Sequence, residues 1–155
     1  MPRNDGLRKP HVVAVERTIA ADPQAVFDVL ADPAQHPVID GSGSVQGVRP
    51  GNPKRLSLGA RFGMDMRIGV SYKIANVVVE YEEGRLIAWR HFAGHRWRYT
   101  LTPVPTGTLV REEWDPTPVP LNWLAYVLMG FPRKNQAGME QTLVRLEQHL
   151  AGART

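Results

Sequence analysis

The fold is decided by residues 56–114, which read LSLGARFGMDMRIGVSYKIANVVVEYEEGRLIAWRHFAGHRWRYTLTPVPTGTLVREEW. Apolar and polar residues alternate along most of this stretch, a pattern that indicates half-buried antiparallel strands joined by hairpins. The chain then continues, from about Pro120 to Leu150, with an apolar stripe at helical spacing. The apolar face of such a sheet has to be buried against another layer, and the closing helix supplies that layer. A curved sheet wrapped around a helix leaves room for a cavity.

The remaining elements follow from turn and cap residues. Two short helices are predicted after the first strand, because Asp22-Pro23 and Asp32-Pro33 each combine a capping residue with a proline suited to the first turn. In the closing helix, Pro132 predicts a kink or break. The fold class is therefore α+β, with a curved seven-stranded antiparallel sheet. Its strands are predicted at residues 12–19, 44–48, 61–68 and 70–82, with a bulge near Asn76, and three more lie between residues 86 and 114.

The hairpin turns set which side chains face the closing helix. We take Glu83-Gly84 and Ala93-Gly94 as two-residue loops and residues 104–107 as a four-residue loop. A three-residue loop near Gly94 would instead bring Trp89 and His91 inside and turn Arg90 out. Opposed residues of neighbouring strands share a face, so the shorter loops place on the inner face Leu86, Ala88, Arg90, Trp97, Tyr99, Leu101, Glu112 and Trp114, and leave Ile87 and Trp89 outside.

Composition favours one domain of a globular protein. The chain has 155 residues, no cysteine and a formal net charge of +4. We expect residues 1–10 to form a flexible tail and residues 11–152 a single domain. Basic residues are not clustered as a nucleic-acid-binding face requires, residues 119–131 are too short to span a membrane, and the N-terminus lacks a signal sequence. A cytoplasmic monomer or homodimer without a cofactor is expected.

Several short segments are shared with a known superfamily. They are VERTI (residues 15–19), VFDVLADP (residues 26–33), His36-Pro37, DGSG (residues 40–43), Trp97 and Pro132. Together with the order of elements, they resemble the helix-grip superfamily, also called SRPBCC, which includes START lipid-transfer domains, birch-pollen-allergen-like proteins and polyketide cyclases or dehydratases. The likeness is strongest to small bacterial polyketide cyclase/dehydrase-like members. It implies a hydrophobic small-molecule cavity between sheet and helix, and it does not choose among carriers, receptors and enzymes.

Glu112 is the functional candidate that the register singles out. It is the only carboxylate on the predicted inner face and lies next to Tyr99, and an unpaired buried carboxylate is costly unless it stays protonated. Arg90 would be within reach, so that the pair would either hold the sheet together or present a polar end to a ligand. His36 and Asp40, at the predicted mouth of the cavity, are further candidates for acid-base work. Glu112 or His36 would be the catalytic group.

The cavity wall is expected to be apolar and aromatic, with methionines that adapt to irregular contents. A metal site is not expected, because His91 and His95 face each other across a hairpin without a third ligand. No serine lies at a nucleophile elbow either. The predicted ligand-binding residues are Met64, Met66, Tyr72, Arg90, Trp97, Tyr99, Glu112, Trp114 and Met129.

Three functions remain open from the sequence. The first is a binding or carrier protein for a hydrophobic or aromatic small molecule held between the sheet and the closing helix. The second is a cyclase or dehydratase for a polyketide-like substrate, with Glu112 or His36 as the acid-base group and Tyr99 as a donor. The third is a stress or regulatory protein whose partner surface includes an exposed Ile87 and Trp89.

Overall fold

The computed structural model describes residues 11–91, 94–117 and 123–153. The predicted N-terminal tail lies outside these residues. The strands are β1 (Val13–Ile19), β2 (Val45–Val48), β3 (Arg61–Ile68), β4 (Val70–Glu82), β5 (Leu86–His91), β6 (Arg96–Val104) and β7 (Gly107–Asp115). The helices are α1 (Pro23–Leu30), the 3₁₀ helix η1 (Pro33–Gln35), α2 (His36–Ile39), α3 (Trp123–Leu128) and α4 (Phe131–Gly152).

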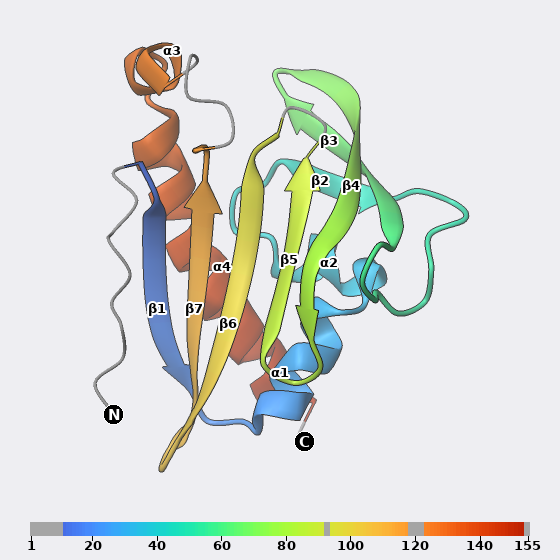
Figure 1. The fold of residues 1–155 in the computed structure, drawn as a ribbon, viewed down its shortest axis with the longest axis vertical. Helices are drawn as coiled ribbons and strands as arrows, with labels where there is room; N and C mark the ends of the chain where they lie inside the picture. The colour runs from blue at the N-terminus through green and yellow to red at the C-terminus, as the bar shows by residue number, and fades with distance from the viewer. Residues whose placement is uncertain (1–10, 92–93, 118–122, 154–155) are drawn as a thin grey trace.

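The sheet and helices form the predicted helix-grip architecture. All seven strands belong to one antiparallel sheet in the order β1-β7-β6-β5-β4-β3-β2. Figure 1 shows α1, α2 and α4 on one face of this sheet, with α4 running diagonally across it. The α+β fold class predicted from the alternation and the closing helix is confirmed.

Helix boundaries follow the predicted cap residues. α1 has Asp22 at its N-cap and a proline in its first turn, and the Asp32 carboxylate accepts a hydrogen bond of 3.0 Å from the Ala34 amide at the start of η1. The predicted break in the closing helix occurs at Gly130, whose φ of 74° is left-handed and suits glycine. Pro132 then lies in the first turn of α4, where its missing N–H is not needed.

β3 and β4 have the predicted bounds and form a long hairpin. The predicted bulge is present in β4, but its register shift lies between Val78 and Glu80 rather than at Asn76. A bulge adds one residue to one strand and bends it. The bend lets the β3-β4 hairpin curl over the inner face of the sheet, which gives the cavity its far wall.

The register between β4, β5 and β6 is not the predicted one. Arg90 pairs with Arg96 rather than with Trp97, because the loop before β6 spans residues 92–94, of which only residue 94 is described. The turn before β5 also holds one residue more than predicted, since Glu82 pairs with Leu86. A one-residue slip reverses every side chain of a strand. The longer-loop alternative is therefore the correct one.

The slip exchanges the two faces of β5. Ile87 is fully buried and Trp89 packs against the core, whereas Arg90 is exposed. Arg90 consequently lies on the opposite face of the sheet from Glu112, and the predicted pair does not form. The exposed surface that Ile87 and Trp89 would have offered to a partner protein is absent for the same reason.

The outer face of the sheet carries a network of ion pairs. The Arg98 guanidinium contacts the Glu80 carboxylate at 2.7 Å and the Glu113 carboxylate at 3.2 Å. Arg98 reaches Glu80 across Ala88, which is paired with both residues and fully buried beneath them. The small side chain of Ala88 on the central strand allows charges from β4, β6 and β7 to meet above the sheet.

α3 does not place its apolar stripe against the core as predicted. Leu124 and Leu128 are 69% and 78% exposed. Tyr126 makes the contact with the sheet instead, since its hydroxyl lies 2.6 Å from His95 Nε2 and its ring packs against Trp114. Among the described helices, none combines the length and apolar character that crossing a bilayer requires.

Candidate functional site

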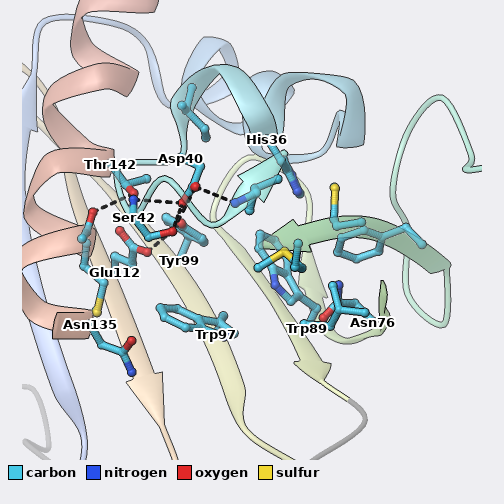
Figure 2. Close-up of a pocket in the computed structure, with 18 residues that line it drawn as sticks. His36, Asp40, Ser42, Asn76, Trp89, Trp97, Tyr99, Glu112, Asn135 and Thr142 are labelled. Carbon is cyan, nitrogen blue, oxygen red and sulfur yellow. Dashed lines mark hydrogen bonds between the residues drawn. The ribbon is translucent and has the colours of Figure 1, made fainter. Parts of the chain in front are cut away.

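A cavity of about 150 Å³ lies between the sheet and the first half of α4. Figure 2 shows polar side chains gathered under the loop that follows α2, with Trp89 and Trp97 on the opposite side. The apolar lining residues are Ile39, Val45, Phe62, Met64, Met66, Ile74, Trp89, Trp97 and Met139. The other lining residues are His36, Asp40, Ser42, Asn76, Tyr99, Glu112, Asn135, Gly138 and Thr142.

α4 leaves room for the cavity because of the residues it presents there. Asn135, Gly138 and Thr142 follow helical spacing on the same face as Met139, and all four line the cavity. One turn further on, the same face carries Leu146, which is fully buried in the core. Small and polar side chains in the first half of the helix do not fill the space that leucines fill in the second half.

The loop after α2 closes one end of the cavity by lying directly on α4. A Cβ atom on Gly41 would lie 2.3 Å from the Thr142 backbone nitrogen, so only glycine permits this approach. The Gly41 amide donates a hydrogen bond of 2.9 Å to Thr142 Oγ1, and that hydroxyl donates to the Gly138 carbonyl at 2.9 Å. Gly41 is therefore the residue that lets this loop pack directly on α4.

Asp40 shapes this loop with its carboxylate. It accepts hydrogen bonds from the Ser42 amide at 3.1 Å, from Ser42 Oγ at 2.7 Å and from the Val45 amide at 3.0 Å. Its backbone carbonyl accepts a hydrogen bond of 2.8 Å from Arg145 on α4. An Asp side chain that bonds to backbone two residues on is a common turn device. Asp40 therefore has a structural role and also brings a negative charge to the cavity.

Glu112 lies at the polar end of the cavity and is 3% exposed. Its Oε1 accepts a hydrogen bond of 2.8 Å from the Tyr99 hydroxyl. Its Oε2 is buried, and no described residue hydrogen bonds to it. Burial raises the pKa of Glu112 to about 8, an increase that the Tyr99 hydrogen bond opposes and the charge of Asp40 reinforces. Glu112 is thus mostly a neutral carboxylic acid at pH 7.

Tyr99 is perturbed in the same direction as its partner. Burial and the neighbouring Glu112 raise the pKa of the Tyr99 hydroxyl well above its usual value. The hydroxyl remains a proton-bearing group at any physiological pH. Glu112 and Tyr99 together form an uncharged pair with donor capacity at the polar end of the cavity.

His36 lines the cavity from α2 and is 8% exposed. Its Nε2 lies 2.8 Å from the Leu30 carbonyl, which can only accept, so Nε2 carries the proton and Nδ1 is the acceptor. The imidazole stacks on Trp89 with ring centroids 5.0 Å apart. Burial lowers the pKa of His36 despite the opposing effect of the Leu30 hydrogen bond. The ring is therefore neutral at pH 7 and part of the aromatic wall.

The structure brings seven of the predicted candidate residues to the cavity and leaves four elsewhere. Arg90 is on the outer face, and Met129 is 59% exposed beyond the end of α3. Trp114 is buried on the inner face but packs under α3 with His95 and Tyr126. Tyr72 pairs with Met66 farther along the β3-β4 hairpin and does not line the cavity. The seven that line it are His36, Asp40, Met64, Met66, Trp97, Tyr99 and Glu112.

Several lining residues were missed from the sequence. Trp89 was assigned to the wrong face by the two-residue loop, and the alternation of β5 alone cannot decide between the two registers. Asn135, Gly138 and Thr142 carried a readable signal, since they interrupt the leucine and methionine stripe of α4 at helical spacing. A core helix with small and polar residues on its buried face is a sign of a cavity.

The histidine pair at the β5-β6 hairpin belongs to a second aromatic cluster. His91 and His95 stack with centroids 6.0 Å apart, and burial together with His95 lowers the pKa of His91 to about 4. The Trp114 indole N–H lies 3.4 Å from His95 Nδ1. Among the described residues, no group of three or more His, Cys, Asp or Glu is placed to hold a metal ion. The pair links the sheet to α3.

Comparison with known proteins relates the whole domain to one family. Residues 10–151 match the family model described as polyketide cyclase / dehydrase and lipid transport. An uncharacterized protein from Mycobacterium tuberculosis is 34% identical over 141 residues, which cover 88% of this chain and 62% of that protein. The chain thus spans about three fifths of the length of this relative.

Solved structures share the fold at lower identity. A crystal structure of a Nitrosomonas europaea protein has a TM-score of 0.73 with 17% identity, covering 92% of this chain and 96% of that one. The solution structure of a polyketide-cyclase-like protein from Corynebacterium glutamicum has a TM-score of 0.60 with 21% identity, covering 92% and 93%. The family match, the long helix packed on the sheet and the cavity between them agree with the resemblance drawn from the sequence. The chain belongs to the polyketide cyclase / dehydrase and lipid transport family, within the SRPBCC-type superfamily.

Proposed function

We propose that the protein binds an apolar small molecule with an aromatic or similarly flat part, held non-covalently in the cavity between the sheet and α4. The observation that carries the proposal is the cavity of about 150 Å³, lined mainly by apolar side chains, inside a domain whose core is otherwise packed. An apolar cavity of about 150 Å³ holds a benzene-sized ring. Members of this superfamily share such cavities, which supports binding without deciding the ligand.

The shape of the wall supports a flat ligand. Trp89 and Trp97 are directly paired across β5 and β6, and both line the cavity. Aromatic side chains offer broad, rigid contact area to a planar guest. Met64 and Met66 lie on β3, which β4 separates from β5, and their flexible thioethers adapt to irregular outlines. The exposed Ser42 and half-buried Asn135 also line the cavity, so it opens to solvent and a longer ligand can extend outward.

A neutral fluorescent probe tests this proposal. N-phenyl-1-naphthylamine should become brighter on binding and should quench tryptophan emission. The Ile74→Trp variant places a large ring in the cavity and should weaken probe binding at least about 10-fold. Ile68→Trp is the matched control, because Ile68 is on the paired strand, is 58% exposed and does not line the cavity. Equal probe affinity in both variants would contradict binding in this cavity.

A second candidate function, a dehydratase or cyclase, is favoured by one observation. Glu112 holds a proton near neutral pH in a water-poor site, as a general acid must, and His36 presents a neutral imidazole to the same cavity. In a dehydration, Glu112 would give its proton to the departing hydroxyl while His36 accepts the proton from the adjacent carbon. Glu112→Gln should then abolish turnover of a β-hydroxy ketone and leave probe affinity unchanged. Unchanged turnover in that variant would rule out this role.

A further inference from the structure

We propose that the buried end of the cavity recognises an uncharged carbonyl oxygen, such as that of a ketone, and discriminates against a carboxylate. Glu112 and Tyr99 supply the recognition, with the Glu112 carboxyl group donating to the ligand. The inference rests on the proposed function, since it assigns the chemical class of the ligand's polar end at the same site.

The hydrogen-bond inventory of Glu112 leaves one oxygen for a ligand. Tyr99 occupies Oε1, and Oε2 has no partner among the described residues although it is buried. Leaving a buried oxygen without a hydrogen bond costs about 1–3 kcal/mol of stability relative to a paired one. A ligand group placed at this end of the cavity recovers that interaction. Glu112 is one of the residues that line the cavity, so a guest in the cavity lies against this side chain.

The charges around the cavity decide what kind of group fits. Asp40 already brings a negative charge to this end, and the described lining residues include no lysine or arginine. A ligand carboxylate would therefore lie near the negative charge of Asp40 without a cation to pair with, in a medium where charge is poorly screened. A carbonyl oxygen carries no net charge and accepts the hydrogen bond that a protonated carboxyl group offers.

The protonation state of Glu112 agrees with this geometry. Burial raises the pKa of Glu112 to about 8. The carboxyl group is therefore a donor at pH 7, and it loses its proton as the pH rises above about 8. Tyr99 from β6 and the charge of Asp40 after α2 act directly on Glu112. His36 lines the same cavity from α2, and α4 contributes Asn135, Met139 and Thr142 to its wall. Tyr99 and His36 stay neutral around pH 7 because of the shifts described above, so Glu112 is the group that changes the site near pH 8.

Four ligands of nearly the same size test the proposal by NMR titration. They are ethylbenzene, acetophenone, benzoate and 1-phenylethylamine, which differ in their polar group. At pH 6.5 we expect acetophenone to bind at least about 10-fold more tightly than benzoate. In Glu112→Leu, acetophenone affinity should fall about 10-fold while ethylbenzene affinity stays the same or rises. Ethylbenzene thereby reports whether the variant still has an intact cavity.

pH and a conservative variant sharpen the test. The acetophenone affinity of the wild-type protein should fall between pH 7 and pH 9.5, whereas that of Glu112→Gln, whose amide still donates, should not change with pH. The proposal is overturned if Glu112→Leu weakens ethylbenzene and acetophenone equally, or if benzoate or the protonated amine binds more tightly than the ketone. If none of the four ligands binds, the proposed function itself fails.

Discussion

The two halves of α4 face the same sheet but enclose different interiors. The second half places Leu143, Leu146 and Leu150 in the core, where the first two are 1% and 0% exposed. The first half places Gly138 and Thr142 against a cavity. The same helix therefore belongs to the core at one end and lines the cavity at the other. The volume of its inward-facing side chains makes the difference. A domain of this fold gains a binding site by leaving part of its helix-sheet interface unfilled.

Truncating the filled half should have the largest effect. Leu146→Ala removes a fully buried side chain from a tightly packed region, which should lower the free energy of unfolding by about 2–5 kcal/mol. Urea denaturation followed by circular dichroism measures the change. A loss below about 1 kcal/mol would mean that the second half of α4 is as loosely packed as the first.

Replacing Glu112, the titratable group on β7 beside the cavity, should change the pH dependence of stability. The folded-state pKa of Glu112, about 8, lies above the unfolded value of 4.5, so the folded protein binds the extra proton and wild-type stability falls as pH rises through this window. Each pH unit corresponds to about 1.4 kcal/mol. From pH 5.5 to pH 7.5, Glu112→Gln should gain about 3 kcal/mol relative to wild type, with no further gain above about pH 8.5. A difference that is constant with pH would mean that Glu112 is ionised in the fold.

Disturbing the contact between α4 and the loop at Gly41 should have a smaller effect on stability. Gly41→Ala puts a Cβ atom 2.3 Å from the Thr142 backbone, so the loop has to move away from α4, at a cost of about 1–3 kcal/mol. Fluorescent-probe affinity should fall as well, because the loop carries Asp40 and Ser42 into the cavity wall. Gly47→Ala is the control, since a Cβ atom there meets nothing within 4 Å. Equal thermal stability of the two variants would show that the contact between Gly41 and α4 is not tightly packed.

Sequence periodicity predicted the elements well because each depends on local chemistry. The β3 and β4 bounds follow from alternation, and the Asp32 carboxylate caps η1. α1 begins at the predicted Pro23, although the Asp22 side chain makes no cap hydrogen bond, and Pro132 marks the break before α4. β5 was the exception. Its alternating residues fit either register, and one extra loop residue in each flanking hairpin reversed Trp89 and Arg90. Loop length within a tight hairpin is set by backbone torsions that a short polar segment does not encode uniquely.

The candidate site was predicted where β6 and β7 alone determine it. The pairing of Tyr99 with Glu112 follows from one hairpin, and the structure has the same pairing. Residues that reach the cavity from distant segments could not be assembled in this way. His36 and Asn135 are far from both strands in the sequence, and each reaches the cavity from a different helix. Their positions depend on how the helices pack across the sheet, which is a long-range property.

By itself, the sequence determined that an antiparallel sheet precedes a single long helix, and that an acidic residue and a tyrosine share the sheet's inner face. These are consequences of side-chain alternation and helical spacing, which act over a few residues. Only the tertiary structure decided that Trp89 faces inward, that Gly41 lies against α4, and that the space beside Glu112 stays open. Those features depend on how side chains that are far apart in the sequence pack together in one interior. Local sequence patterns do not determine that packing.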